Sequence, residues 1–575
     1  MVSHSRRLFL RCGALAPQKD SSTSALSSNG ARWRWSVESR DRLRRQMSTA
    51  PPTASEASSR RPTREQRIQT LKDLGITAYP RYTPSPPEFP LMDVQRVHEQ
   101  WDSMLEKGAK LENEQVTVQG RIHRKRESSK RLFFIDIEQN GQTIQIAASL
   151  VRASGGAGAD AESFAKHYRA LLVGDIVRVS GFVGKTNTGE TSVFAVRAME
   201  LLTPCLHTIP SRSGLVDMEK RFRKRHLDML VNPHVKNALA VRAKALSFIR
   251  GFLSARQFVE VETPILSATV GGASARPFAT RSVAFGDTEL FMRVAPELFL
   301  KQLVIGGMDR VYEIGKQFRN EGVDSDHNPE FTTCEFYQAY ATLEDLLQST
   351  EEMIRGLVQT VTGSLRVRVE GPPPSGHSAQ STHTVVDFAP PFRRINVTEM
   401  LRQKAPDLPP DLNDPAAIPR IISVLKAQGI ALPRPLTLPR LLDRLISRHI
   451  EPECTQPTFL VSHPSVMSPL SKPADAENAT SARFELFVNS TELVNAYEEL
   501  NDPFIQRQNF SLQAAQKDAG DDEIPAPDLA FCDALEYALP PTGGWGMGID
   551  RVVALLAGVS HLREAISFPI MRPQK

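Results

Sequence analysis

Hydrophobic positions along the chain follow a helical period in some stretches and a strand period in others. Apolar residues at near-helical spacing begin after Pro62 and stop before the prolines from Pro80 onward, which predicts an N-terminal helical segment within residues 62–112. A second helical pattern covers residues 234–255 and runs into an extended stretch that ends at Pro264. A β-rich stretch lies between these two patterns.

The β-rich stretch consists of short runs of β-branched or aromatic residues. These runs lie at residues 116–118, 132–137, 143–147, 177–179 and 193–196. Asn140-Gly141, between the second and third runs, is a hairpin signal. About five strands between residues 113 and 204 close most economically into a small barrel, and the oligonucleotide-binding (OB) fold has that size and strand count.

One hairpin of the predicted barrel mixes cations with aromatic rings. Its two phenylalanines, Phe133 and Phe134, are flanked by His123, Arg124, Lys125, Arg126, Lys130 and Arg131. Cations can neutralise phosphates while an aromatic ring stacks on an unpaired base, which contributes ~1–3 kcal/mol per base. Because neighbouring strand residues face opposite sides, only one of the two rings can stack on a base, and the other belongs to the core. A solvated basic face explains the same residues equally well.

Composition narrows the class of protein without identifying a partner. The 575 residues are enough for about three or four folding units, and 41% hydrophobic with 23% charged residues is ordinary soluble usage. No apolar run approaches the ~18 residues of a membrane span, so no membrane segment is predicted. The net charge of +5 is small, so a polyanion must be bound by local patches. Five cysteines without a CxxC pair argue against a zinc site or a disulfide framework, and Cys334 is expected to be structural.

The N-terminus differs in composition from the rest of the chain. Residues 1–47 are rich in arginine, serine and alanine and poor in acids, which favours a mitochondrial transit peptide over a disordered basic tail. Arg11 interrupts the apolar stretch before it, which argues against a secretory signal. Residues 48–61 are expected to be a disordered Pro/Ser/Ala linker. The mitochondrial matrix is the expected location, and a start at Met47 would give a shorter cytosolic form.

Residues suited to binding a nucleotide and its phosphates occur in two stretches of the sequence. Arg319-Asn320-Glu321 is followed by a polar loop with His327 and then by Phe331, and the apolar flanks predict two strands. Such a hairpin can hold a cation and an acid opposite an aromatic ring, which suits a nucleotide. Near the C-terminus, the glycine-rich residues 543–548 precede Arg551 at a predicted helix start. This run is not a P-loop, so phosphate binding there is expected to depend on arginine.

These motifs resemble those of a known family. The stretch ending at Pro264, Phe318-Arg319-Asn320-Glu321 with Phe331, and Gly546-Met547-Gly548-Ile549-Asp550-Arg551 resemble motifs 1, 2 and 3 of the class II aminoacyl-tRNA synthetases, in that order. Further motifs resemble the lysine-specific members: Gly271-Gly272-Ala273-Ser274-Ala275-Arg276-Pro277-Phe278, Ala295-Pro296-Glu297-Leu298, His327-Asn328-Pro329-Glu330-Phe331-Thr332, Asn495-Ala496-Tyr497-Glu498-Glu499-Leu500-Asn501-Asp502 and Pro540-Pro541-Thr542-Gly543-Gly544-Trp545. The resemblance covers roughly residues 62–575.

The resemblance implies an α+β fold with two functional domains. An N-terminal OB-fold β-barrel (113–204) would bind the anticodon, and a linker (205–219) would lead to a class II catalytic domain (220–575), an antiparallel sheet flanked by helices. Motif 1 would form a homodimer. The implied activity is ATP-dependent activation of L-lysine to lysyl-adenylate and transfer to the 3′ end of tRNA(Lys), in mitochondrial translation. Neither step needs a side-chain nucleophile, because positioning and charge neutralisation provide the rate.

The resemblance also assigns residues to the nucleotide end of the site. Arg319 is expected to hold the α-phosphate and the substrate carboxylate, and Arg551 and His327 the γ-phosphate. Phe331 is expected under adenine, and Glu321 against adenine or the tRNA end. Arg319, Arg551, Glu321 and His327 are thus the expected catalytic residues, and the ATP site is completed by Asn328, Gly548, Glu485 and Glu492. The last two are the expected Mg²⁺ ligands, with an exposed strand carboxylate as the alternative for Glu485.

Lysine needs acids at both of its nitrogens, because an ammonium taken from water requires charged partners. The resemblance implies Glu297 for the α-amine, and Glu499 with Tyr337 for the ε-ammonium. Glu335 alternates onto the same strand face as Tyr337 and either assists there or pairs with Arg319. The lysine pocket is completed by Gly272, Asn495 and Tyr497, and the expected anticodon contacts in the barrel are Arg126, Phe134 and Gln145.

Two stretches depart from the family pattern. After Thr280 the family usually shows two histidines and an asparagine, whereas this chain continues with Arg281-Ser282-Val283 and an unusual loop through Gly286. The departure therefore leaves the role of this loop in lysine binding or lid closure open. Residues around 365–385, rich in proline, glycine, serine and histidine, predict a flexible insertion.

Three other classes of protein share some of these features. Aspartyl and asparaginyl relatives have the barrel and the class motifs, but their pockets must offer cations or amide partners, and the acids Glu297 and Glu499 argue against both. A lysine-modifying paralogue usually lacks the anticodon barrel. A non-catalytic RNA-binding protein would be expected to lose some of the phosphate-binding arginines and metal-binding glutamates, all of which remain.

Overall fold

The computed structural model describes residues 62–153, 160–210, 215–322, 324, 327–370, 383–475, 477, 479–518 and 520–574. The predicted transit peptide (1–47) and linker (48–61) lie outside these residues. Within the described ranges, no helix is long and apolar enough to cross a lipid bilayer.

The first β-domain is a barrel preceded by the helices α3 (Arg64–Asp73) and α4 (Val94–Trp101). Its strands are β1 (Lys110–Ser129), β2 (Leu132–Gln139), β3 (Gln142–Ser149), β4 (Ile176–Lys185), β5 (Thr191–Ala195) and β6 (Glu200–Thr203). The sheet order is β1-β2-β3-β5-β4-β6, and an additional β1–β4 pairing closes the barrel. All five predicted β runs coincide with these strands, except that Val196 lies one residue beyond the end of β5. The helices α5 (Leu150–Ala153) and α6 (Ala161–Ala170), between β3 and β4, were not anticipated.

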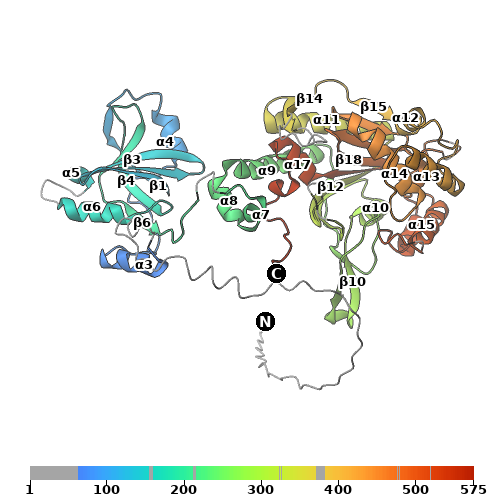
Figure 1. Cartoon of the computed structure of the whole chain (residues 1–575), viewed down its shortest axis with the longest axis horizontal. Coiled ribbons are helices and arrows are strands. Elements are labelled where there is room, and N and C mark those ends of the chain that lie inside the picture. The colour runs from blue at the N-terminus through green and yellow to red at the C-terminus, as the bar shows by residue number, and fades with distance from the viewer. Residues whose placement is uncertain are drawn as a thin grey trace, which may run out of the picture. The chain divides into compact units, whose positions relative to one another are not determined.

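The two neighbouring phenylalanines of β2 face opposite sides, as alternation predicts. Phe133 is fully buried and stacks on Tyr168 of α6 with ring centroids 5.3 Å apart. The α6 helix therefore seals one side of the barrel core (Figure 1). Phe134 is only half-buried and lies under the guanidinium of Arg126, 5.0 Å from its ring centroid. The core role thus belongs to Phe133, and Phe134 is the ring that remains accessible.

The second β-domain is built on an eight-stranded sheet. Its strands are β7 (Val259–Glu260), β11 (Arg310–Phe318), β12 (Glu330–Ala339), β15 (Arg393–Asn396), β16 (Thr458–Val461), β17 (Arg483–Val488), β18 (Thr491–Glu498) and β19 (Thr542–Gly548). Their order is β15-β16-β17-β18-β19-β12-β11-β7, antiparallel except at its two ends. This antiparallel sheet confirms the fold class predicted for the C-terminal part.

Helices cover both faces of this sheet (Figure 1). One face packs against α9 (Pro233–Ser254), α11 (Leu343–Thr362) and α17 (Ile549–Ala557). At the centre of that layer Phe336 and Trp545 stack 4.8 Å apart, and the indole N–H donates to the Thr350 hydroxyl at 2.8 Å. The other face packs against α10 (Glu297–Ile305), α15 (Pro503–Asp518) and α16 (Leu529–Leu535). A separate core forms between α12 (Val397–Lys404), α13 (Ile418–Ala427) and α14 (Leu438–His449).

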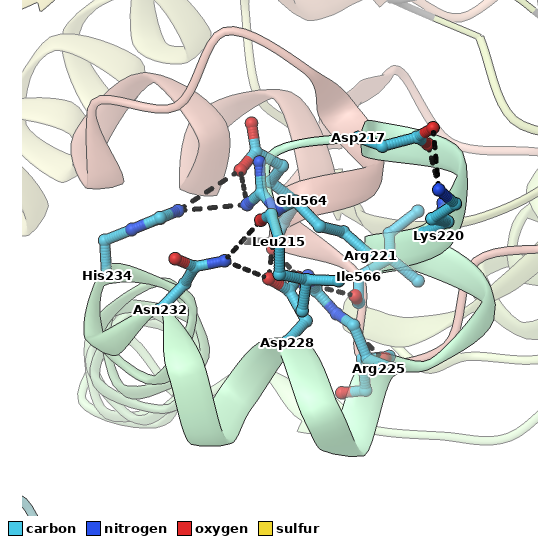
Figure 2. Close-up of polar contacts among 11 residues, drawn as sticks. Leu215, Asp217, Lys220, Arg221, Arg225, Asp228, Asn232, His234, Glu564 and Ile566 are labelled. Carbon is cyan, nitrogen blue, oxygen red and sulfur yellow. Dashed lines mark hydrogen bonds and ion pairs between the residues drawn. The ribbon is translucent and has the colours of Figure 1, made fainter. Parts of the chain in front are cut away.

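The C-terminal segment is held to this domain by a buried ionic network (Figure 2). The network joins α7 (Met218–Arg223), α8 (Arg225–Val231) and the 3-10 helix η6 (Leu562–Ala565). Arg221 contacts Asp228 at 2.9 Å and Glu564 at 2.7 Å, and Arg225 reaches the other oxygen of Asp228 at 2.6 Å. Asp228 is fully buried, and although burial alone would raise its pKa, Asn232 and the arginines lower it. The segment that follows α17 is therefore fixed by charge pairs as well as by packing.

The two stretches that depart from the family pattern have the following structure. Residues 279–292 form β9 (Ala279–Ser282), the 3-10 helix η2 (Val283–Phe285) and β10 (Thr288–Met292), and β10 also pairs with β8 (Leu266–Ser267). The predicted insertion begins and ends as paired strands, β13 (Arg366–Glu370) and β14 (His383–Asp387), because Val367, Val369 and Val386 reach the core. Residues 371–382 lie outside the described part. The remaining short elements are η3 (Pro415–Ala417), η4 (Glu451–Glu453) and η5 (Ser465–Met467).

Candidate active site

A cavity of about 530 Å³ lies against strands β12, β18 and β19. The strand register explains the space. Gly544 of β19 pairs with Tyr337 on one side and Tyr497 on the other, and Gly546 pairs with Glu335 and Asn495. Because glycine has no side chain, the middle strand leaves room between four larger side chains.

Most of the residues predicted from the sequence line this one cavity. They are Gly272, Glu297, Arg319, Glu321, His327, Asn328, Phe331, Glu335, Tyr337, Glu492, Asn495, Tyr497, Gly548 and Arg551. Residues more than 270 positions apart are thereby brought together. Two predicted residues, Glu485 and Glu499, are not among those that line the cavity: Glu499 is buried, whereas Glu485 is partly buried and lies beside the lining residue Arg483.

At one end of the cavity, the β11–β12 hairpin presents a cation over an aromatic ring. The guanidinium carbon of Arg319 lies 5.2 Å from the centroid of the Phe331 ring. The buried Nε of Arg319 has no hydrogen-bond partner among the described residues. In the described part of the chain, no ion pair joins Arg319 to Glu335. The structure therefore lacks the Arg319 pairing that was the alternative role predicted for Glu335. A donor without a partner facing a cavity suits an anionic ligand.

The loop of the hairpin carries the other predicted nucleotide contacts. His327 is exposed, and its Nδ1 lies 3.0 Å from both carboxylate oxygens of Asp324. Asn328 is buried and donates to the carbonyl oxygen of Glu330 at 2.6 Å, while its own side-chain oxygen has no partner among the described residues. Burial raises the pKa of Glu321, which Arg319 and His327 only partly offset.

Arg551 enters the cavity from the first turn of α17. It donates to the carbonyl and to a carboxylate oxygen of Glu492, at 3.0 and 3.1 Å. The helix start is fixed by its neighbour Asp550, which is buried, pairs with Arg242 of α9 and accepts from the backbone N–H of Thr332 at 2.8 Å. Asp550 therefore ties α9, β12 and α17 together at the site. Arg242 had no sequence signal beyond its place on a long helix.

Glu485 lies on β17 beside two cationic groups. It pairs with Arg483 and lies 3.2 Å from Nε2 of His463. Burial alone would raise the pKa of Glu485, but Arg483 and His463 outweigh it and lower the pKa to about 2. It is not the exposed strand carboxylate considered as the alternative. Two further acids are close: burial and then Glu485 raise the pKa of Asp443, and burial raises that of Glu451 to about 7.

The other end of the cavity is acidic. Glu297 begins α10, lines the cavity and accepts from the hydroxyl of Tyr497 at 2.8 Å. Gly272 lies against it with φ +86°, and a Cβ there would come within 3.0 Å of the Glu297 Cβ. Glycine at this position thus satisfies both the backbone conformation and the close approach.

Glu335 and Tyr337 share the cavity face of β12. Burial, followed by the charge of Glu297, raises the pKa of Glu335 to about 8. The Thr333 hydroxyl donates to Glu335 in a long hydrogen bond of 3.3 Å. Burial also raises the pKa of Tyr337 well above its usual value. At neutral pH the raised pKa values favour a protonated Glu335 and a neutral Tyr337 phenol.

Glu499 is fully buried behind Gly544 and pairs with Lys301, a residue that the sequence reasoning missed. A signal existed, because Lys301 follows Glu297 by four positions on a helix whose neighbouring positions Leu300 and Val304 are buried. Arg483 was also missed, although it alternates with Glu485 on one strand and donates to Asn495 at 3.0 Å.

A second hollow lies on the barrel, and it concerns the predicted anticodon contacts. Gln145 lines it and donates to Glu190 at 2.8 Å. Phe134 and Arg126 lie beside the hollow on the same hairpin, since Phe134 precedes the lining residue Asp136 by two positions. An aromatic cluster that the sequence did not predict supports this face: Phe182 and Phe194 are buried, stack 5.4 Å apart under Arg152, and pack against Phe134. The more accessible ring of Phe134 under Arg126 suits an unpaired base.

Comparison with family models gives two matches. Residues 217–572 match the family described as class II tRNA synthetases (D, K and N), and residues 116–201 match an OB-fold nucleic acid binding domain. The first match covers more than half of the chain.

Curated relatives match over most of their length. The lysine--tRNA ligase cla4 of Cladosporium cladosporioides is 43% identical over 480 residues, 82% of this chain and 78% of the relative. A probable cytoplasmic lysine--tRNA ligase of Encephalitozoon cuniculi is 44% identical over 462 residues, 80% of this chain and 88% of the relative. The mitochondrial lysine--tRNA ligase of Schizosaccharomyces pombe is 40% identical over 521 residues, 88% of this chain and 93% of the relative.

Proposed function

The chain belongs to the class II tRNA synthetases of the D, K and N group, and from that premise we propose that it is a lysine--tRNA ligase that joins L-lysine to tRNA(Lys). The observation that carries this choice is the acidic end of the cavity, where Glu297 and Glu335 line the wall and Glu499 lies behind it. Aspartate or asparagine would meet carboxylates there, whereas lysine brings two ammonium groups. The names of the relatives agree with this choice.

The chemistry proceeds in two displacements. A lysine carboxylate oxygen attacks the α-phosphorus of ATP, and the bond to the bridging oxygen breaks, which releases pyrophosphate. The terminal ribose hydroxyl of tRNA then attacks the lysyl carbonyl carbon, and AMP leaves. Arg319 is the residue for the carboxylate and α-phosphate, because it lines the cavity and its Nε has no hydrogen-bond partner among the described residues. Neutralising both anions lowers the cost of bringing them together.

The remaining nucleotide roles follow from position in the cavity. Phe331 offers its ring to adenine, with Glu321 and the unpartnered oxygen of Asn328 as polar partners. His327 and Arg551 are the γ-phosphate contacts, and Gly548 leaves room for the phosphates beside Arg551. Arg551 donates a hydrogen bond to Glu492. We expect a phosphate oxygen to replace Glu492 as the partner of Arg551 when ATP binds.

Mg²⁺ is the proposed metal, held by Glu492 and Glu485 together with phosphate oxygens. In the described residues no group of three or more His, Cys, Asp or Glu could hold a metal ion alone, so oxygens of the nucleotide must complete the set. Both carboxylates fit such a shared site, since Glu492 lines the cavity and Glu485, whose pKa is lowered to about 2, is ionised. When bound, the ion neutralises triphosphate charge.

Lysine is proposed to bind with its α-amine at Glu297 and its ε-ammonium between Glu335, Tyr337 and Glu499. Tyr497 orients Glu297 through its hydroxyl, and Asn495 and Gly272 shape the pocket. The barrel is proposed to read the anticodon through the Phe134 ring with Arg126 and Gln145.

A homodimer and a mitochondrial location complete the proposal. The outer edge of the large sheet is the short strand β7, and its Val259 is half exposed, as expected of a strand that a second copy covers. Light scattering of the purified protein tests the dimer. The arginine-rich, acid-poor residues 1–47 and the mitochondrial relative support the matrix. Imaging of full-length and Met47-start forms tests the location.

The activity itself is tested by amino-acid-dependent ATP–pyrophosphate exchange and by charging of purified tRNA. Lysine alone among the standard amino acids should drive exchange, and tRNA(Lys) should accept the lysyl group. Exchange driven by aspartate or asparagine instead would refute the lysine assignment while leaving the family membership intact.

A further inference from the structure

Lys301 is a fully buried cation in the wall behind the lysine end of the cavity. It lies on α10, one helical turn after Glu297, and its side chain is 0% exposed. Its Nζ donates to Oε1 of Glu297 at 2.6 Å and contacts Oε2 of Glu499. The rings of Tyr497 and Phe531 lie 5.8 and 5.6 Å from Nζ. An ammonium removed this completely from water needs charged partners, and here both partners belong to the substrate site.

Lys301 contacts one oxygen of each carboxylate. On Glu297, both the Lys301 ammonium and the Tyr497 hydroxyl use Oε1. On Glu499, the ammonium contacts Oε2, while the buried Oε1 has no hydrogen-bond partner among the described residues and lies close to Gly544, where a Cβ would be 1.8 Å away. Lys301 therefore links the acid that lines the cavity, Glu297, to the acid behind Gly544.

Charge counting shows what this ammonium contributes. Three carboxylates, Glu297, Glu335 and Glu499, belong to this end of the site, and a bound lysine brings two ammonium groups. Lys301 is the third ammonium, so three ammonium groups balance three carboxylates when lysine is bound. Without it, one buried carboxylate would have no counter-charge and would have to hold a proton.

We propose that Lys301 is a positioning residue for the substrate: an internal ammonium that holds Glu297 and Glu499 in place and supplies their counter-charge, so that the lysine complex is charge-balanced. The inference rests on the lysine--tRNA ligase function proposed above and deepens it. Lys301 touches no substrate atom and acts only through the two acids.

The other titratable groups that face these acids do not replace Lys301. Tyr337 from β12 and Tyr497 from β18 are phenols whose pKa burial raises well above its usual value, so both are neutral. Glu335 from β12 adds negative charge. Burial alone would lower the pKa of Lys301, but Glu297 and Glu499 raise it above its usual value, which keeps the ammonium charged.

The test compares Lys301→Met with wild type in lysine-dependent pyrophosphate exchange between about pH 6 and 9. Methionine keeps the length and apolar volume of the stem but removes the charge. Gln302→Met is the matched control, because it places the same residue one position along the same helix, on the exposed side. The variant's lysine KM is divided by the wild-type lysine KM at each pH, so that titration of free lysine cancels.

The proposal predicts a KM ratio of about tenfold or more at pH 7 that falls as the pH rises. Burial raises the pKa of Glu499 well above its usual value and Lys301 opposes that rise, so without Lys301 the carboxyl ionises only at higher pH. The KM for ATP should stay within about twofold, and Gln302→Met should match wild type. A ratio that is near one, or raised but constant with pH, would overturn the proposal. If wild type itself shows no lysine-dependent exchange, the proposed function fails and the inference fails with it.

A second variant covers the case in which Lys301→Met does not fold. Lys301→Ala leaves a space for propylammonium, which restores the missing ammonium, whereas propanol fills the space without charge. Propylammonium should lower the lysine KM of Lys301→Ala while inhibiting wild type, and propanol should not lower it. Equal rescue by both compounds, or rescue by neither, would show that Lys301 only fills space and would refute its electrostatic role.

Discussion

The raised pKa of Glu335 predicts that lysine binding is coupled to proton release. Glu335 lies on the cavity face of β12, and burial together with Glu297 raises its pKa to about 8. An adjacent ε-ammonium favours the ionised form, so bound lysine must expel the proton. At pH 7, one unit below that pKa, about one molecule in eleven has Glu335 ionised, which weakens lysine binding about tenfold, or ~1.4 kcal/mol.

The raised pKa of Glu335 fixes the direction in which the lysine KM changes with pH. Because Glu335 is protonated below about pH 8 when no lysine is bound, the lysine KM should fall as the pH rises from 6 to 8 and then level off. The fall should approach tenfold per pH unit. Glu335→Gln cannot lose a proton, so its lysine KM should be nearly independent of pH over this range and should exceed the wild-type value most at high pH.

Two assays check this prediction. Initial rates of lysine-dependent pyrophosphate exchange give KM at each pH, and calorimetric titration in two buffers of different protonation enthalpy counts protons, about 0.9 per lysine at pH 7. Thr333→Val is the matched control, because it removes the 3.3 Å hydrogen bond to Glu335 but keeps the acid. A wild-type KM that does not change between pH 6 and 8, or an undiminished proton release in Glu335→Gln, would refute the reasoning.

Three further substitutions test other parts of the account. Gly544→Ala should raise the lysine KM about a hundredfold while leaving the KM for ATP within about twofold, because its Cβ would lie 1.8 Å from Oε1 of Glu499; exchange kinetics measure both constants. Phe134→Ala should lower kcat/KM for tRNA charging about tenfold and spare exchange, since it removes one stacking ring; loss of both activities would mark it as a folding residue. Asp228→Ala should lower the free energy of unfolding by about 3–5 kcal/mol in urea melts, because it leaves two buried arginines without their shared partner, and a change under 1 kcal/mol would contradict this.

The sequence was most informative where strand alternation and motif order act locally. The five β runs of the barrel and the opposite orientations of Phe133 and Phe134 follow from a two-residue period. The helices α5 and α6 were not predicted. The α5 segment is only one turn long, whereas α6 did carry signals, an N-cap at Asp160 and apolar Phe164 and Tyr168 four positions apart. The strands β13 and β14 were hidden beside a Pro/Gly-rich stretch that by composition predicts only flexibility.

In the candidate active site, the sequence motifs identified the residues that line the cavity but not the residues that hold those side chains in place. Glu485 and Glu499 were predicted as direct ligands, and the structure places each beside a cationic partner that was not predicted, Arg483 or Lys301. Lys301 and Glu499 come from different elements, so only the fold brings them together. The other two contacts are local and visible in the sequence: Arg483 alternates with Glu485 on β17, and Lys301 follows Glu297 by four positions on a buried helix face.

The central claim is that this cavity selects a substrate by its two ammonium groups, and a comparison of lysine with norleucine tests it most directly. Norleucine has nearly the same shape and lacks only the ε-ammonium. In calorimetric titration of the full-length protein at pH 8, lysine should bind at least about a thousandfold more tightly, since the buried acids would otherwise lack a partner. Similar affinities for the two compounds would contradict the account.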